Sequence, residues 1–334
     1  MNPILTGLAL SGALVAPSLA MHGENEVALT TKVYRSWKIR LPAEGWRKVG
    51  KAVQVASWDK SFAAKLDGTS LRLDTDADGE VDTTIDKKGG VVLLTHGKER
   101  LALRLRSAPD WSYAPASVKV GEIEGKRVRL IDQNNNGRFD DFGADAMVIG
   151  RGKAASFLSK VVRVDSKLFE IGVSSNGGQL TYKPYEGPTS QIDFKVLSKG
   201  KILAAVLKST NGDFSFDVSN VKKAITIPTA SYRIHSGLLS FGGNKVSVRS
   251  GSAKAVALTA NASAEIRLGG PARVEFAYET KGGKYHFAPD RIWYFGRAGE
   301  EYYNWQPLGK SPLITIDDAL KNTRLAEVIF PPNC

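Results

Sequence analysis

The stretch around which this sequence is organised is Asp132-Gln133-Asn134-Asn135-Asn136-Gly137-Arg138-Phe139-Asp140-Asp141, and an earlier stretch has the same spacing, Asp74-Thr75-Asp76-Ala77-Asp78-Gly79-Glu80-Val81-Asp82. In both, side chains with oxygen atoms stand at positions 1, 3 and 5, glycine stands at position 6, and aspartate stands at position 9. Alternate side chains of a tightly coiled loop converge on one point, and Ca²⁺ takes about six to eight oxygen ligands. Glycine permits the positive φ that turns the chain around such an ion. Both stretches therefore predict calcium loops.

The two stretches resemble the calcium loops of EF-hand, dockerin and thrombospondin type 3 proteins over about nine to twelve residues each, and the resemblance covers nothing else in the chain. Carried over by position, it implies side-chain oxygen ligands at positions 1, 3 and 5, which are Asp74, Asp76, Asp78, Asp132, Asn134 and Asn136. It implies main-chain carbonyl ligands at Glu80 and Arg138. It also implies direct or water-mediated ligands at Asp82 and Asp140.

Position 12 departs from the EF-hand pattern, because Ile85 and Gly143 stand where an EF-hand has a bidentate glutamate. Nearby acids can replace that ligand: Asp86, Asp141 and Asp145. Neither loop follows a helical segment, since Arg72-Leu73 and Arg129-Leu130-Ile131 continue strands. We therefore expect static calcium sites with a Kd of about 10⁻⁴ to 10⁻³ M rather than a conformational sensor.

The same residues have a second interpretation, because Asp, Asn and Gly are also the residues of ordinary tight turns. Against it, the first loop places five acids in one short stretch, where they would repel one another without a cation. The second loop is less acidic but repeats the spacing. Cages made entirely of protein oxygens suit Ca²⁺ better than the smaller Mg²⁺, so Ca²⁺ is the predicted cofactor. No catalytic residue is predicted.

The composition is that of a globular protein, with 24% charged and 42% hydrophobic residues among 334. A net charge of +12 favours anionic partners, but the cations are scattered among strands, which also fits a solvated surface with no dedicated partner. The candidate partners are an anionic envelope or extracellular polysaccharide, or another protein. Nucleic acid is disfavoured because no clustered basic helix is present. The only cysteine is Cys334, so an intrachain disulfide is impossible. Bound calcium is the candidate for stabilising the fold in place of disulfides.

Residues 1–20 are predicted to be a signal peptide. The segment is apolar and has no charged side chain. It ends in Ser18-Leu19-Ala20, whose small residues suit a signal peptidase. The Lys or Arg that usually stands near the start of a signal peptide is missing. No later window approaches the length of a membrane span. We therefore expect an exported protein, periplasmic or extracellular, with no membrane span after the signal peptide.

Short alternating segments separated by Gly, Asn and Pro clusters predict a mostly β, multidomain chain. Residues 21–190 form a β-rich region with calcium loops at 74–86 and 132–145. Residues 191–334 contain short predicted strands at fairly regular spacing, which indicates an immunoglobulin- or transthyretin-like β-sandwich. One strand is expected within 24–36, and one short helix over 317–327, where acids open the segment.

The stretch 290–305 is a candidate second functional surface, since it sets Glu300 and Glu301 among six aromatic residues. Aromatic faces beside carboxylates hold sugar rings, and paired acids serve glycosidases. The plainer interpretation is core packing, which also applies to the group Trp37, Trp46 and Trp58. Adjacent acids on a strand point to opposite faces and would not form a catalytic pair.

Taken together, these features predict an exported calcium-binding β-protein that acts as a binding or interaction module. The alternative is a carbohydrate-active enzyme or carbohydrate-binding module that uses residues 290–305. Calcium would be structural in the first case, neutralising the clustered acids and fixing the strand connections.

Overall fold

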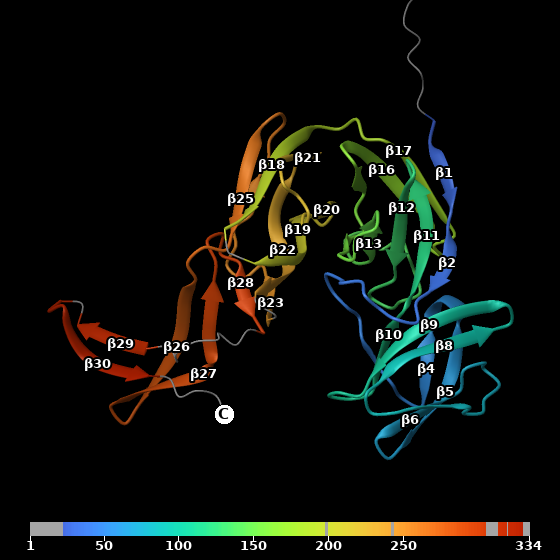
Figure 1. The fold of residues 1–334 in the computed structure, drawn as a ribbon, viewed down its shortest axis with the longest axis horizontal. Coiled ribbons are helices and arrows are strands. Elements are labelled where there is room, and N and C mark those ends of the chain that lie inside the picture. Colours follow the sequence, from blue (N-terminus) through green and yellow to red (C-terminus); the bar gives the residue numbers. More distant parts are fainter. Residues whose placement is uncertain (1–22, 198–199, 242–243, 305–312, 319, 330–334) are drawn as a thin grey trace, which may run out of the picture. The chain divides into compact units, whose positions relative to one another are not determined.

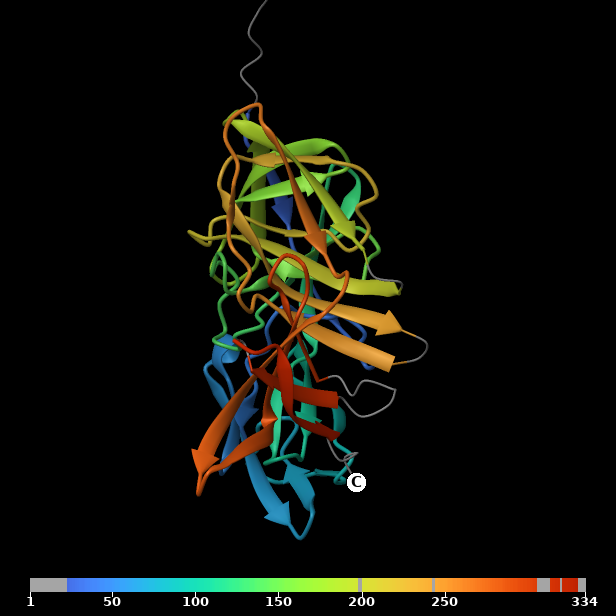
Figure 2. The same ribbon diagram turned by 90° about the vertical axis from the view of Figure 1, so that its left-hand side faces the viewer.

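The computed structural model describes residues 23–197, 200–241, 244–304, 313–318 and 320–329. Within these ranges the regular structure is β-strand apart from one short 3-10 turn, η1 (Ala56–Trp58), as Figure 1 shows. Figure 2 shows the same strands after a rotation of 90°. The prediction of a mostly β chain is confirmed. In this part of the chain no helix is long and apolar enough to cross a membrane, and the predicted signal peptide lies outside the described residues.

The chain divides into two compact units, each assembled from separate segments. Unit 1 comprises Met1–Lys38, Ala43–Gly152 and Phe157–Pro188, and unit 2 comprises Ile39–Pro42, Lys153–Ser156 and Thr189–Cys334. The main division therefore falls close to the predicted boundary between 21–190 and 191–334. The two short early segments of unit 2 were not expected from the sequence, and they are joined by a parallel bridge between Arg40 and Ala154.

Two four-stranded antiparallel sheets in unit 1 share a first core. One has the order β4-β5-β6-β7, with β4 (Ala52–Val55), β5 (Lys60–Asp67), β6 (Ser70–Leu73) and β7 (Thr83–Ile85). The other has the order β3-β10-β9-β8, with β3 (Arg47–Lys48), β10 (Ser112–Pro115), β9 (Glu99–Arg106) and β8 (Gly90–His96). Their buried side chains form one cluster: Val49, Val53, Val55, Phe62, Leu71, Leu73, Val92, Leu94, Leu103, Leu105, Trp111 and Tyr113.

Two further sheets of unit 1 surround a second core. The first has the order β1-β17-β16-β15, with β1 (Asn25–Ala28), β17 (Gln179–Pro184), β16 (Lys167–Val173) and β15 (Val161–Val164). The second has the order β14-β13-β12-β11-β2, with β14 (Ser156–Phe157), β13 (Ala146–Ile149), β12 (Lys126–Ile131), β11 (Ser117–Ile123) and β2 (Thr30–Val33). Their buried cluster contains Leu29, Ile123, Val128, Leu130, Met147, Leu158, Val162, Val164, Phe169, Ile171 and Leu180.

The single strand predicted within 24–36 is in fact two strands in different sheets. β1 pairs with β17 and β2 pairs with β11, and the chain changes sheet at Leu29. Leu29 is buried in the second core, and its N–H donates to the carbonyl of Gly178 at 2.8 Å. The alternation of side chains continues from β1 into β2, so the sequence pattern gives no sign that the chain changes sheet between them.

Strand β9 alternates, with leucines on one face and Arg100, Arg104 and Arg106 on the other, and Arg104 of this cationic face is covered as well. Arg104 is only 9% exposed, and its guanidinium carbon lies 4.4 Å from the ring centroid of Trp37 and 5.1 Å from that of Trp46. It also pairs with Glu44 at 2.7 Å. Trp58 packs against the first core, as core packing predicts. For the other two tryptophans that prediction is wrong: they cover a nearly buried arginine, an arrangement that cation–π attraction stabilises.

Unit 2 is built on a three-stranded and an eight-stranded sheet. One has the order β21-β18-β25, with β21 (Ile225–Pro228), β18 (Thr189–Val196) and β25 (Ser263–Leu268), and its β18–β25 pair is parallel. The other has the order β20-β19-β22-β23-β28-β27-β26, with β20 (Ser215–Asp217), β19 (Lys201–Ser209), β22 (Ser231–Phe241), β23 (Asn244–Arg249), β28 (Glu301–Tyr303), β27 (Lys284–Phe295) and β26 (Arg273–Lys281), while β24 (Val256–Ala257) pairs with β22. Both contribute to one buried cluster: Ile192, Phe194, Ala205, Leu207, Phe216, Val218, Ile225, Ile227, Tyr232, Ile234, Leu258, Ile266 and Leu268.

The short helix predicted over 317–327 is wrong. The segment belongs to a hairpin of β29 (Leu313–Asp318) and β30 (Thr323–Ile329). The acid that was expected to open a helix instead closes the hairpin turn, because Asp318 Oδ1 accepts the N–H groups of Leu320 and Lys321 at 2.8 and 3.1 Å. Asn322 takes a left-handed conformation with φ of 50°, which Asn tolerates and which ends such turns.

We expect a histidine on β22, His235, to make the stability of the folded chain depend on pH. Burial lowers the pKa of His235 to about 4, and the positive charges of Lys208 and Arg233 add to this effect. The unfolded chain therefore takes up the proton first as the pH falls, and stability is lost between pH 6.5 and 4. We expect the His235→Gln variant to lose about 1–3 kcal/mol less than the wild type between pH 7.5 and 4.5 in urea unfolding.

The matched control is His286→Gln on the exposed part of β27, which is expected to keep the pH dependence of the wild type. Equal pH dependence for the wild type and both variants would show that His235 does not lose its proton on folding.

Candidate metal centre and adjoining cleft

The first loop begins directly after β6, where Asp74 is 1% exposed. Its Oδ1 accepts hydrogen bonds from the N–H groups of Asp76 and Ala77 at 3.0 and 2.8 Å, and its Oδ2 accepts one from Gly79 at 3.1 Å. Ala77 and Gly79 have positive φ values of 64° and 94°. The backbone thus coils around the carboxylate at position 1.

Three carboxylates of the first loop come together in this coil. Asp74, Asp76 and Asp78 each offer an oxygen, and these oxygens lie within 4.8 Å of one another. Such a group of oxygens suits a hard cation. At position 7, the exposed Glu80 donates its N–H to Asp78 Oδ1 at 2.7 Å.

Asp82, at position 9, is held by the loop itself. Its carboxylate accepts the N–H and the hydroxyl of Thr75 at 3.0 and 2.9 Å. Burial acts to raise the pKa of Asp82, but hydrogen bonds from Thr83 and Thr75 outweigh it, so the pKa is lowered. Asp86 accepts the N–H of Lys88 at 2.8 Å in the turn after β7.

The second loop, which follows β12, repeats this geometry. Asp132 is 6% exposed, and its two oxygens accept the N–H groups of Asn136 and Gly137 at 3.0 and 2.7 Å. Positive φ values recur at positions 4 and 6, with 60° at Asn135 and 86° at Gly137. Two stretches that share a spacing therefore share a backbone conformation. This agreement goes beyond what a similar composition alone requires.

Asp145, just before β13, is the acid most closely associated with Asp132. It is 1% exposed, and its Oδ1 has no hydrogen-bond partner among the described residues, while its Oδ2 accepts the N–H of Asp141 at 3.2 Å. Burial raises the pKa of Asp145 to about 8, and the negative charge of Asp132 is the next largest cause. Burial also raises the pKa of Asp132, against its hydrogen bonds from the loop N–H groups. The charge of Asp132 thus opposes the ionisation of Asp145, and burial disfavours the charged form of both groups.

The remaining predicted ligands of the second loop lie around this pair. The amide groups of Asn134 and Asn136 both donate to Asp141 Oδ2, at 2.9 and 2.5 Å. These bonds, the one from Asn134 first, lower the pKa of Asp141. Asp140 binds the Arg138 guanidinium through two hydrogen bonds of 3.1 and 2.8 Å, so an ion pair already holds its carboxylate.

The second loop also packs against other segments of unit 1. Gly137 lies so close to η1 that an added Cβ would come 2.6 Å from the backbone nitrogen of Ser57. Phe139 donates its N–H to the carbonyl of Ser175 at 2.9 Å, in the turn between β16 and β17. Gln133 accepts the N–H of Gly45 on its carbonyl at 2.6 Å. The loop therefore connects three segments that are distant in the sequence.

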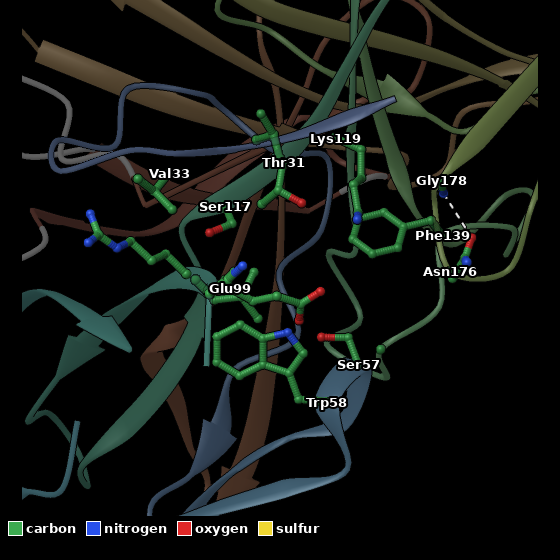
Figure 3. A pocket seen from close by; sticks show the side chains of 15 residues that line it. Thr31, Val33, Ser57, Trp58, Glu99, Ser117, Lys119, Phe139, Asn176 and Gly178 are labelled. Atoms are coloured by element: carbon green, nitrogen blue, oxygen red, sulfur yellow. Dashed lines mark hydrogen bonds between the residues drawn. The ribbon is translucent and has the colours of Figure 1, made fainter. Parts of the chain in front are cut away.

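A cleft of about 660 Å³ lies beside the second loop. Figure 3 shows its labelled side chains, which come from β2, η1, β9, β11, the second loop and the turn before β17. The lining is mixed: Thr31, Val33, Ser57, Trp58, Lys98, Glu99, Arg100, Leu101, Ser117, Val118, Lys119, Gly137, Phe139, Asn176 and Gly178. Its volume falls within the usual range of small-molecule sites, about 300–1,000 Å³.

The acids of the stretch 290–305 have structural partners. Glu300 is fully buried, and its carboxylate accepts the N–H groups of Gly269 and Ala298 at 2.6 and 3.0 Å and the hydroxyl of Tyr302 at 2.8 Å. Glu301 forms two hydrogen bonds of 2.8 and 2.6 Å with the Arg249 guanidinium. Each acid is thus engaged separately, so we assign neither of them a catalytic role. Trp305 lies outside the described residues.

Comparisons of the chain with protein-family models, with curated proteins and with solved structures found no match. The candidate sites therefore rest on the residues and their geometry.

Sequence reasoning named the loop residues but missed the cleft. Its lining comes from segments spread between Thr31 and Gly178, and no spacing along the chain brings them together. The cations Lys98, Arg100 and Lys119 were the one signal that could have indicated the cleft. In the sequence they are only scattered charges.

Proposed function

We propose that this chain is an exported calcium-binding β-protein that acts as a binding or interaction module, with calcium in a structural role. The observation that carries the proposal is the burial of two carboxyl groups in the second loop, Asp132 and Asp145, together with an Asp145 Oδ1 that has no hydrogen-bond partner among the described residues. Burying such a group without a partner costs free energy, and a bound cation would offset that cost. The proposal makes Asp145 the ligand that replaces the missing EF-hand glutamate.

The first loop supports the same proposal by repetition. Its oxygens at positions 1, 3 and 5 lie within 4.8 Å of one another around a backbone with the same positive φ pattern. We propose that the side chains of Asp74, Asp76 and Asp78 and the carbonyl of Glu80 hold the first ion. In the second loop the corresponding groups are those of Asp132, Asn134, Asn136 and Arg138, with Asp141 and Asp145 completing the site.

Export agrees with the expected strength of these sites. Loops without the bidentate glutamate are expected to bind with a Kd of about 10⁻⁴ to 10⁻³ M, the range of extracellular modules. Sites this weak fill only where calcium is abundant, outside the cytoplasm. The apolar segment at residues 1–20 supports the same location.

For unit 2 we propose an immunoglobulin- or transthyretin-like sandwich as the architecture of the interaction module. Its support is that the three-stranded and the eight-stranded sheets share one buried cluster. The parallel β18–β25 pair departs from the purely antiparallel pairing of such sandwiches.

Equilibrium dialysis against millimolar calcium tests the proposal. We expect about two ions per mature chain with a Kd of about 10⁻⁴ to 10⁻³ M, and one ion per chain after either Asp74→Ala or Asp132→Ala. Each substitution removes the position-1 oxygens of one loop and leaves the other loop intact.

Asp213→Ala is the control, because Asp213 lies in an Asn-Gly-Asp turn of unit 2 that has similar residues but not the calcium-loop spacing. It is expected to leave the bound calcium unchanged. Absence of bound calcium in the wild type would overturn the proposal, and a Kd below about 10⁻⁶ M would contradict the argument for export.

A further inference from the structure

We propose that the cleft beside the second loop binds an acidic oligosaccharide, a short chain of sugar rings that carry carboxylate groups. This inference rests on the proposed function, because it names the ligand class of the proposed binding module. It is carried by the juxtaposition of two aromatic rings, a partly buried ammonium and one carboxylate in a cleft whose wall includes the second loop.

The two aromatic rings are held in place from outside the cleft. Trp58 ends η1, and its ring centroid lies 6.2 Å from that of Phe62 and 6.0 Å from that of His96. Phe139 packs on the bare backbone of Gly177, where an added Cβ would come 2.7 Å from the ring. Figure 3 shows both rings at the cleft, with the Glu99 carboxylate between them in the view. Fixed aromatic faces offer the apolar side of a sugar ring a surface to stack on.

The charge of the lining selects for an anion. Lys98, Arg100 and Lys119 line the cleft, against the single carboxylate of Glu99. Lys119 lies in the middle of β11, partly buried, with its Nζ 5.5 Å from the centroid of Phe139. Burial lowers the pKa of Lys119, and the charge of Glu99 acts in the opposite direction. Attraction between this ammonium and a ligand carboxylate is stronger than at an exposed lysine, because less water screens it.

The uncharged polar groups match the hydroxyls of a sugar. Thr31, Ser57 and Ser117 contribute hydroxyls and Asn176 contributes an amide, and all of these both donate and accept hydrogen bonds. Glu99 only accepts, which suits a sugar hydroxyl. The volume of about 660 Å³ leaves room for more than one ring. An acidic saccharide therefore matches the aromatic, polar and cationic groups of the lining.

The test is calorimetric titration of the mature chain, in millimolar calcium, with trigalacturonate as the acidic probe and maltotriose as the neutral one. We expect measurable binding of trigalacturonate and at least tenfold weaker binding of maltotriose. Lys119→Met and Trp58→Ala are each expected to weaken trigalacturonate binding at least tenfold. Lys126→Met is the matched control, because it removes the same charge from β12 at a residue that does not line the cleft and pairs with Asp165.

Thermal unfolding in calcium shows whether each variant is folded. The inference is overturned if trigalacturonate does not bind, if maltotriose binds equally well, or if folded Lys119→Met binds like the wild type. Tighter binding of a triglutamate peptide would also overturn it in favour of a peptide ligand. Equilibrium dialysis distinguishes failure of the cleft proposal from failure of the calcium proposal. If calcium binds and trigalacturonate does not, the calcium proposal stands and the cleft proposal fails. If trigalacturonate binds and calcium does not, only the cleft proposal is supported.

Discussion

Replacing EDTA with about 5 mM calcium is expected to raise the unfolding temperature of the mature chain by several degrees. Sites with a Kd of about 10⁻⁴ to 10⁻³ M would stabilise the folded state by about 1–2 kcal/mol each at this concentration. For a unit of this size, each kcal/mol corresponds to about 2–4 °C. Differential scanning calorimetry of the two samples measures the change directly.

Asp145→Asn assigns part of that rise to the second loop. The amide keeps the size of the side chain and its acceptor for the Asp141 N–H, but it cannot ionise to supply a carboxylate ligand. We therefore expect the variant to lose about half of the calcium-dependent rise. In EDTA its unfolding temperature should be no lower than that of the wild type, because the amide, unlike the buried carboxyl group, cannot ionise. A full calcium response in this variant would remove Asp145 from the site.

The second large effect is a loss of stability expected when Gly137→Ala adds a single methyl group. Gly137→Ala places a Cβ 2.6 Å from the Ser57 nitrogen and 2.7 Å from the Ala56 carbonyl carbon, both of them backbone atoms that cannot rotate away. Its φ of 86° adds strain for any residue with a side chain. We expect a loss of about 2–4 kcal/mol in urea unfolding, which is the usual scale of a strained or overpacked buried site.

Gly79→Ala is the matched control, because Gly79 occupies position 6 of the first loop with a φ of 94°. No atom lies within 4 Å of its added Cβ, so only the conformational strain remains, about 1 kcal/mol. Equal losses of unfolding free energy in the two variants would show that the close approach of Gly137 to η1 does not contribute to the loss.

The strand-rich character of the chain could be predicted from local patterns. The alternation of Leu103 and Leu105 on β9 and the spacing of the two loops depend only on neighbours in the sequence, and both patterns reappear in the structure. The predicted helix failed because an acid at the start of an expected helix and an acid at the start of a hairpin turn look alike in sequence. The hairpin is decided by pairing between β29 and β30.

Features that depend on long-range packing could not be predicted. Asp145 was one of several acids able to complete a site, and only its burial beside Asp132 distinguishes it. The covering of Arg104 by two tryptophans depends on segments far apart in the chain. The cleft likewise has no signature in the sequence, because its lining is drawn from seven separate elements and turns.

The short early segments of unit 2 have a consequence for how the chain folds during synthesis. Arg40 lies in a segment made near the beginning, yet its Nη1 donates to the carbonyl of Leu203 on β19 at 3.5 Å. Unit 2 cannot be completed until that later strand has emerged, and contacts of such large sequence separation slow folding. During synthesis the segment around Arg40 therefore stays without this partner while the intervening residues of unit 1 are made, so the order of synthesis favours completing unit 1 first.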